Sequence, residues 1–495
     1  MKNASALFLM VGLSTATSAA TAAETTWVKV ASQYQFFTLT SSQLVRFGTD
    51  TRWVQKTLSG KIYCGVGTFG SDPAYGVDKE CQVASTPGAT SSAFTPACNT
   101  FYASNFTLAS GKTNDPIPVI SKPVKGITVT EPTYKTCLVR LTNHSADGTS
   151  GFARNDYSRR QAFNSDSSKY LVSALDGYWH VYSTSNYGRL KTLSGPAGDA
   201  EPQWHPTNPD LMYYLPTNGV GMKIHELTVS TNTSRVVADL SARVKAIWPT
   251  ANAAWTKSEG SPSKDGRYWC FMVDDQNWNS LGVITWDKAT DTIVGKMNTN
   301  GDRPDHVSMS PSGNYCVVSG DGPRGTVAYS RDFSTSKLLL SKSEHSDIGI
   351  DANGNDIYVS VDYQSNGGDV FMININTGLR TSLFPTYVSG SATALHVSAK
   401  NFNKPGWALI STYANYGGNG KEWLHKKVFA VQLKSNPKIY NLAFHRAVEN
   451  GYFTEPVASV NRDFNKIIFN SNWNVNTAED IDAYMVEIPN SALVE

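Results

Sequence analysis

The sequence has little charge, and neither sign is in clear excess. Charged residues make up 17% of the 495 residues, and the formal net charge is +2. No run of Lys or Arg concentrates that charge locally. A chain this weakly charged lacks the field that attracts nucleic acid or an anionic membrane surface. We therefore expect no nucleic-acid partner.

Long hydrophobic runs are also missing. The apolar run near the N-terminus, residues 6–13, is too short to cross a bilayer. It follows Lys2 and precedes small residues up to Ala23, which is the pattern of a secretory signal. Residues 1–23 are therefore predicted to be a signal peptide. We expect the mature chain to be secreted or periplasmic, without membrane insertion, and to act as a monomer.

The motifs of several common enzyme classes are absent. The chain has no Cys-x-x-Cys or Cys/His zinc spacing, no nucleophile elbow, no phosphate loop, no dinucleotide fingerprint and no His-Glu-x-x-His. Paired carboxylates for glycoside hydrolysis cannot be selected either, because four candidates stand at comparable positions. These candidates are Asp156, Glu201, Asp305 and Glu455.

What the chain does contain is a repeated unit, of which residues 303–322 are the best example. A short strand at 306–309 is followed by a Ser-Pro-Ser-Gly turn and a second strand at 314–319. Pro311 restricts φ, and Gly313 supplies a backbone conformation that other residues avoid. This pattern is typical of a tight β-hairpin.

Related units recur along the chain and indicate an all-β fold. Roughly seven units are spaced roughly 40 to 60 residues apart, which is the period of propeller blades. A third and often a fourth strand-like run follows each unit, as in a blade of four strands. The further units begin at residues 164, 205, 261, 351, 399 and 459.

We therefore predict a seven-bladed β-propeller at 131–495, preceded by a linker at 87–130 and a small disulfide-stapled β module at 24–86. The linker is rich in Ser, Thr, Pro and Ala. The run at 131–142 is expected to complete the last blade beside 484–489, because such pairing would close the ring and remove exposed sheet edges.

Export permits disulfides among the six cysteines. Cys64 and Cys81 lie close together in the N-terminal module and are predicted to pair. For the other four the sequence leaves the pairing open. Strand parity favours Cys270 with Cys316, since both would point between stacked sheets, and this choice leaves Cys98 with Cys137.

Candidate chemistry is expected where the chain leads into the innermost strand of each blade, because these loops share one face of the ring. Histidine recurs at this position, and a convergent set of imidazoles can bind a metal or move protons. The alternative is that each imidazole bonds the backbone of a neighbouring blade. The four residues are His306, His345, His396 and His445.

Cations and aromatic side chains stand at similar positions. Arg154, Tyr157 and Arg159 would lie beside the channel, and guanidinium groups match the geometry of carboxylates. An Arg–Asp network that braces the first blade is the alternative. The predicted substrate-binding residues are Trp204, Arg303 and Trp473, although a Trp in a β-protein also packs in the core.

The runs at 305–311, 344–347 and 445–473 resemble the blade starts of propeller-type polysaccharide lyases, in particular the oligogalacturonide lyases. The resemblance implies β-elimination on a uronic-acid glycan, with His306 as the base. It also implies a divalent cation (manganese, calcium or zinc) at His345, His396 and His445. The Gln-x-x-His-x-His cluster of that family is missing from this chain.

Ulvan-type lyases, which are also propellers, use His, Tyr and Arg, and by that resemblance Arg154, Tyr157 and His144 would serve. The predicted catalytic residues are thus His306, Tyr157, Arg154 and Arg159. Residues 24–86 resemble a module of secreted bacterial proteins, several of them glycan-degrading, through Trp53, the two cysteines and 69–73. The competing hypothesis is a non-catalytic propeller that binds a glycan or a protein.

Overall fold

The computed structural model describes residues 26–85, 98, 100–196, 202–257, 260–417 and 420–494. The predicted signal peptide and Glu201 lie outside these residues. The chain divides into two compact units, Met1–Thr95 and Pro96–Glu495. Regular structure is nearly all β. The described helical turns are α1 (Val66–Phe69), α2 (Ser241–Lys245), η1 (Pro216–Gly219) and η2 (Tyr452–Thr454).

Among the described residues, no helix has the length and apolar character needed to cross a membrane. The first unit is a four-stranded sheet with the strand order β1-β4-β2-β3. Cys64 and Cys81 form a disulfide beneath this sheet, beside the buried Phe47. The strands are β1 (Thr26–Ser32), β2 (Phe36–Thr49), β3 (Arg52–Tyr63) and β4 (Glu80–Ser85).

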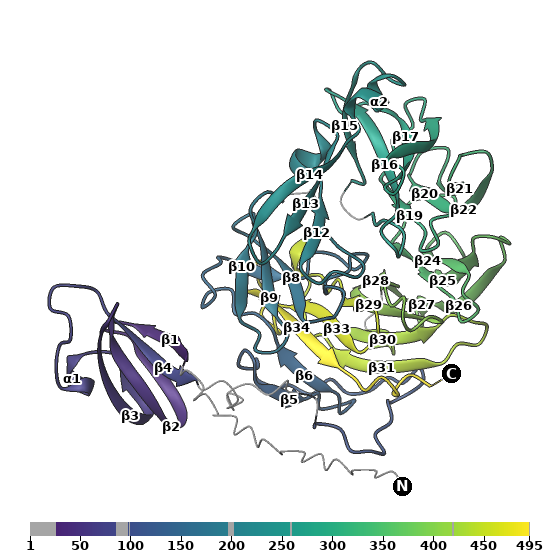
Figure 1. Cartoon of the computed structure of the whole chain (residues 1–495). Helices are drawn as coiled ribbons and strands as arrows, with labels where there is room; N and C mark the ends of the chain where they lie inside the picture. Colours follow the sequence, from purple (N-terminus) through teal and green to yellow (C-terminus); the bar gives the residue numbers. More distant parts are fainter. Residues whose placement is uncertain are drawn as a thin grey trace, which may run out of the picture. The chain divides into compact units, whose positions relative to one another are not determined.

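The second unit contains six sheets, and Figure 1 shows them following one another around a common centre. Four of them are antiparallel four-stranded sheets, as expected for blades. Their strands are β11 (Gln203–Trp204), β12 (Leu211–Tyr214), β13 (Lys223–Thr228), β14 (Thr233–Asp239), β15 (Ala251–Trp255), β16 (Tyr268–Asp275), β17 (Ser280–Asp287), β18 (Thr292–Asn298), β19 (His306–Met309), β20 (Tyr315–Ser319), β21 (Thr326–Ser330), β22 (Ser336–Leu340), β23 (Ser346–Ile350), β24 (Asp356–Asp362), β25 (Asp369–Asn374) and β26 (Arg380–Pro385).

The other two sheets of this unit have five and nine strands. The five-stranded sheet consists of β27 (Tyr387–Val388), β28 (Ser391–Ser398), β29 (Trp407–Tyr416), β30 (Lys427–Gln432) and β31 (Ile439–Phe444). The nine-stranded sheet consists of β5 (Thr128–Thr130), β6 (Cys137–Arg140), β7 (Phe152–Arg154), β8 (Lys169–Ala174), β9 (Trp179–Ser183), β10 (Arg189–Thr192), β32 (Ser459–Val460), β33 (Lys466–Ser471) and β34 (Ile481–Glu487).

The two ends of the second unit meet in the nine-stranded sheet. β6 pairs with β34, so that Cys137 lies opposite Glu487, and this pairing confirms the one expected between 131–142 and 484–489. β34 also pairs in parallel with β7, which joins the first and last groups of strands into one sheet. The fold is therefore propeller-like, and the count of seven separate blades stays a prediction.

The hairpin at 306–319 has the geometry that its turn predicts. Gly313 has φ 76°, and its backbone N–H donates to the Ser310 carbonyl oxygen at 2.8 Å. A Cβ at Gly313 would also lie 2.4 Å from the Tyr268 ring of the neighbouring sheet. Glycine is thus required here both by the backbone conformation and by the close packing of two sheets.

Residues 100–130, predicted to be a linker, instead pack on the second unit. Leu108 is buried in a cluster with Trp407 and Phe469, and Cys98 is bonded to Cys137. Because the segment is mostly polar, its sequence gives little sign of the few residues that attach it to the second unit. Cys270 is bonded to Cys316 across neighbouring sheets, so the three pairs are those that spacing and parity favoured, and no cysteine is free.

Candidate functional site

The site is built around a contact between two different sheets. Arg159 lies in the loop between β7 and β8, and His306 begins β19. The Arg159 Nη1 atom lies 2.7 Å from His306 Nε2 and 3.0 Å from Nδ1. A guanidinium group can only donate, so the imidazole accepts. Asp305 Oδ2 lies 3.3 Å from Nδ1 and is itself held by Lys257.

Three aromatic rings stack beside this contact. His345 precedes β23, His396 lies on β28 and Tyr413 lies on β29. The ring centroids of His345 and His396 are 4.3 Å apart, and those of His396 and Tyr413 are 4.8 Å apart. Tyr157 meets His396 edge-on at 5.2 Å. Arg159 lies over the Tyr157 ring at 5.4 Å, which joins the stack to His306.

Glu455 completes the cluster. Its Oε2 atom lies 2.7 Å from His396 Nε2. Burial raises the pKa of Glu455 to about 7, although His345 and Arg154 act against that rise. The buried His396 Nδ1 finds no hydrogen-bond partner among the described residues. The pair therefore holds a proton that can move near neutral pH.

The imidazoles of the cluster are neutral at physiological pH. Burial, followed by the charge of Arg159, lowers the pKa of His306 to about 4. Burial is also the main cause that lowers the pKa of His345 and of His396 to about 3. Neutral imidazole is the form that accepts a proton. The cluster thus presents proton acceptors beside guanidinium groups.

Arg154 contributes a second buried cation. Its Nη1 donates to the backbone oxygens of Asn155 at 3.1 Å and Asp156 at 3.0 Å, and its buried Nε has no hydrogen-bond partner among the described residues. Burial lowers its pKa. The rings of Tyr452 and Phe453 lie near it and are 52% and 42% exposed. A charge in this setting suits a carboxylate that arrives with a ligand.

The structure thus brings together six of the predicted residues: Arg154, Tyr157, Arg159, His306, His345 and His396. His445 does not join them, because its Nδ1 accepts from the backbone N–H of Ala447 at 3.0 Å and the ring is buried. This contact lies within the loop of His445 itself, so it is not the bond to the backbone of a neighbouring blade that the alternative describes.

The predicted substrate-binding residues lie elsewhere than expected. Trp204 and Trp473 are buried in hydrophobic clusters, where their indole N–H groups donate to the carbonyl oxygens of Ala162 and Ile120. Arg303 is held by Asp274 at 2.8 Å. Buried indoles cannot present a face to a sugar ring, so the core alternative holds for both tryptophans.

The candidate cation position also differs from the predicted one. Among the described residues, the group of three whose ligand atoms lie within 4.8 Å of one another is His144, Asp480 and Asp482. His345, His396 and His445 form no such group, because His345 Nδ1 lies 2.7 Å from the Leu395 carbonyl oxygen and its ring stacks on His396. Stacked rings direct their nitrogens past one another rather than to one point.

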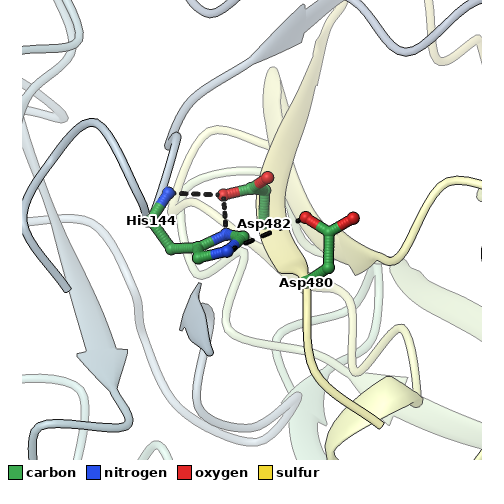
Figure 2. Close-up of side chains that lie close together, drawn as sticks. All are labelled: His144, Asp480 and Asp482. Carbon is green, nitrogen blue, oxygen red and sulfur yellow. Dashed lines mark hydrogen bonds and ion pairs between the residues drawn. The ribbon is translucent and has the colours of Figure 1, made fainter. Parts of the chain in front are cut away.

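Figure 2 shows His144 facing both carboxylates. Its Nδ1 lies 3.2 Å from Asp482 Oδ1, and its Nε2 lies 3.7 Å from Asp480 Oδ1. One imidazole and two carboxylates suit manganese, calcium or zinc. Lys122 Nζ lies 2.9 Å from Asp480 Oδ1 and 3.1 Å from Asp482 Oδ2, and Arg140 Nη2 lies 2.6 Å from Asp482 Oδ2. These two cationic side chains neutralise the carboxylates.

Sequence reasoning missed two parts of these sites. Glu455 stood among four equivalent carboxylates, and only its contact with His396 distinguishes it. Asp480 and Asp482 were not predicted from the sequence, and they lie where the chain enters β34. The Asp-Ile-Asp spacing was the available signal, but its partner His144 lies far away in the chain.

The fold and the cluster together define a propeller-like β-protein in which different sheets contribute buried imidazoles, guanidinium groups and a carboxyl group to one cluster. No protein-family model matches the chain. It is similar to an oligogalacturonate lyase solved in complex with manganese, with a TM-score of 0.52 and 13% identity over 78% of this chain and 98% of that one. It is also similar to the oligogalacturonate lyase of Vibrio parahaemolyticus, with a TM-score of 0.53 and 12% identity over 78% and 99% of the two chains. At such identity the likeness concerns the fold.

Proposed function

We propose that this protein is a secreted polysaccharide lyase that cleaves a uronic-acid-containing glycan by β-elimination. The observation that supports it best is the contact of Arg159 with His306 inside a cluster of Tyr157, His396 and Glu455. The lyase reaction needs a cation for the uronate carboxylate, a base for the C5 proton and an acid for the leaving oxygen. The cluster supplies all three kinds of group.

His306 is the proposed base. Asp305 orients the ring through Nδ1, as carboxylates orient catalytic imidazoles elsewhere. The Arg159 charge lowers the pKa of His306 and engages its Nε2. When Arg159 turns to the carboxylate of a substrate, Nε2 becomes free and the imidazole becomes more basic. Binding of the correct substrate would then activate the base.

Arg154 and Arg159 are the proposed carboxylate ligands, and Tyr157 is the proposed acid. Tyr157 touches both the Arg159 guanidinium and the His396 ring. Through His396 it adjoins Glu455, whose pKa of about 7 lets it return a proton after each turnover. Neutralising the carboxylate increases the acidity of the C5 proton, which is why the cations are essential.

A divalent cation is proposed at His144, Asp480 and Asp482, whose donor chemistry fits it. When bound there, such a cation would supply a positive charge for an acidic group of the glycan. Asp482 pairs with Ala153, the residue before Arg154, so this position adjoins the strand that bears the Arg154 side chain.

Secretion, a monomeric state and a glycan-directed role for the N-terminal module belong to the same proposal. Three disulfides suit an oxidising compartment such as the periplasm or the exterior. The proposed partner in such a compartment is the polysaccharide substrate.

The test is a screen of purified protein on oligogalacturonate, polygalacturonate, alginate, ulvan and glucuronan, read by the ultraviolet absorbance of unsaturated products. Wild type should form such products on at least one glycan. His306→Ala should lower the rate on it by roughly 100-fold or more, the usual contribution of a general base. His225→Ala, on β13, should retain the rate. Absence of absorbance on every uronate glycan would refute the lyase function.

A non-catalytic glycan-binding propeller is the second candidate, favoured by one observation. Tyr157, His306 and His396 are 5%, 4% and 1% exposed, whereas Tyr452 and Phe453 near Arg154 are open to solvent. Exposed rings suit sugar binding without catalysis. Binding of a glycan that the protein leaves uncleaved would support this candidate.

A further inference from the structure

Tyr413 belongs both to the histidine cluster and to a cavity beside it. Its ring stacks on His396, and it also lines a cavity of about 290 Å³. This volume is at the lower end of the range for ligand pockets. The remaining polar side chains of the lining come mainly from the segment that leads into β30. They include Lys421, His425 and Lys426.

The two lysines bring positive charge to this cavity, and the carboxylate that acts on Lys421 is Asp115. Asp115 Oδ2 lies 3.5 Å from Lys427 Nζ and so pairs with that lysine rather than with Lys421 or Lys426. Burial lowers the pKa of Lys426. Burial also lowers the pKa of Lys421, and the charge of Asp115 opposes this only in part. Lys421 lies over the Phe444 ring at 5.6 Å. Half-buried ammonium groups that lack an ion pair are still costly, and an anion in the cavity would reduce that cost.

His425 adds a hydrogen-bond donor that has no acceptor. Its Nδ1 accepts from the backbone N–H of Glu422 at 2.9 Å. In the neutral ring Nε2 must then bear the proton. The side chain is 9% exposed, and Nε2 is buried without a partner among the described residues. A buried donor left unsatisfied in this way points to a ligand that supplies the acceptor.

We propose that this cavity is a subsite for the carboxylate of a uronate unit adjacent to the unit that is cleaved. The inference rests on the proposed function and adds the groups that recognise the neighbouring sugar. A carboxylate accepts several hydrogen bonds at once, so it can satisfy both ammonium groups and His425 Nε2. Tyr413 connects the subsite to the catalytic cluster and sets the two sugar positions side by side.

The test measures binding of trigalacturonate to the full chain, with His306→Ala as background so that nothing is cleaved. In that background, Lys426→Gln, Lys421→Gln and His425→Asn should each weaken binding by roughly tenfold, the effect of losing one charge-assisted contact. His425→Asn retains an acceptor for Glu422 N–H. Lys434→Gln changes an exposed lysine in the turn between β30 and β31, and this matched control should bind like the background.

Two further ligands test whether binding depends on the carboxylates of the sugar or only on nonspecific attraction to the lysines. A carboxyl-reduced trisaccharide should bind the background weakly and the three variants equally weakly. Inorganic phosphate should compete only at high concentration, because it fills one subsite. Equal trigalacturonate affinity in all variants would overturn the proposal, as would an equal loss with Lys434→Gln.

The failures of the two proposals are distinguishable. If the three variants weaken binding while wild type forms no unsaturated product, the subsite holds and the lyase function fails. If wild type cleaves oligogalacturonate and the variants cleave it with unchanged KM, the lyase function holds and the subsite fails.

Discussion

Arg159 and His306 are 147 positions apart in the chain, and the Arg159 guanidinium donates to the His306 imidazole at 2.7 Å. Arg159 comes from the loop between β7 and β8, and His306 is the first residue of β19 in a different sheet. Their contact exists only because the sheets are arranged around a common centre. The contact makes the pKa of His306 depend on the position of Arg159.

Arg159→Gln should raise the pKa of His306 from about 4 towards its ordinary value of 6.5, since the second largest cause of its depression is removed and burial remains. The shift can be followed by NMR of the histidine ring protons across a pH titration. Arg380→Gln, which removes an ion pair with Asp362, should leave the His306 titration unchanged. If His306 titrates identically in both variants, Arg159 does not control it.

The raised pKa of Glu455 gives stability a defined pH dependence. The folded protein binds this proton more tightly than the unfolded chain, so the contribution is full below 4.5 and is lost as pH rises through about 7. Relative to Glu455→Gln, wild type should lose about 3 kcal/mol of unfolding free energy across that window. Denaturant titrations at several pH values measure it.

The pKa of His396 is lowered to about 3. The pH dependence of its contribution to stability therefore has the opposite sign to that of Glu455. Its contribution is present above 6.5 and is lost as pH falls, whereas that of Glu455 is lost as pH rises. A difference that grows as pH falls, rather than as pH rises, would contradict the assignment of the shift to Glu455.

The disulfide of the small first unit should dominate its local stability. Replacing Cys64 and Cys81 by Ala removes a cross-link between residues 17 positions apart. The replacement should lower the free energy of unfolding of this unit by about 3 kcal/mol. Hydrogen exchange on the full chain should show faster exchange in β1–β4, while amides of β24 keep their protection. Unchanged protection in β4 would show that the sheet alone holds this unit.

Lys122 should compete with a cation at His144, Asp480 and Asp482. Burial alone would raise the pKa of Asp482, but the hydrogen bond from His144 and the charges of Arg140 and Lys122 outweigh it and hold the pKa at about 2. Lys122→Gln should therefore strengthen Mn²⁺ binding by roughly tenfold, as removal of a charge at ion-pair distance implies. Electron paramagnetic resonance of free Mn²⁺ measures it.

Two comparisons complete this prediction. Asp480→Asn should weaken Mn²⁺ binding, and Asp156→Asn should leave it unchanged, because Asp156 is paired with Arg160 instead. Binding that responds to neither Lys122→Gln nor Asp480→Asn would place the cation elsewhere in the chain.

Local patterns were enough to predict most strands and turns. The hairpin at 306–319 follows from Pro311 and Gly313, because these residues restrict the backbone wherever they stand. The β6–β34 pairing followed from the need to cover sheet edges. The nine-stranded sheet did not follow, since the parallel contact of β34 with β7 depends on how the two ends of the unit meet.

The candidate site likewise combines features that the sequence predicts with features that depend on the tertiary structure. By itself the sequence determined that His306 and His345 begin or directly precede a strand, because strand periodicity is local, whereas the structure places His396 within β28. Only the tertiary structure decided that Glu455 contacts His396, that Trp204 and Trp473 are buried, and that His144 meets Asp480 and Asp482. Those relationships depend on distances between sheets, and such distances arise from packing rather than from any local pattern.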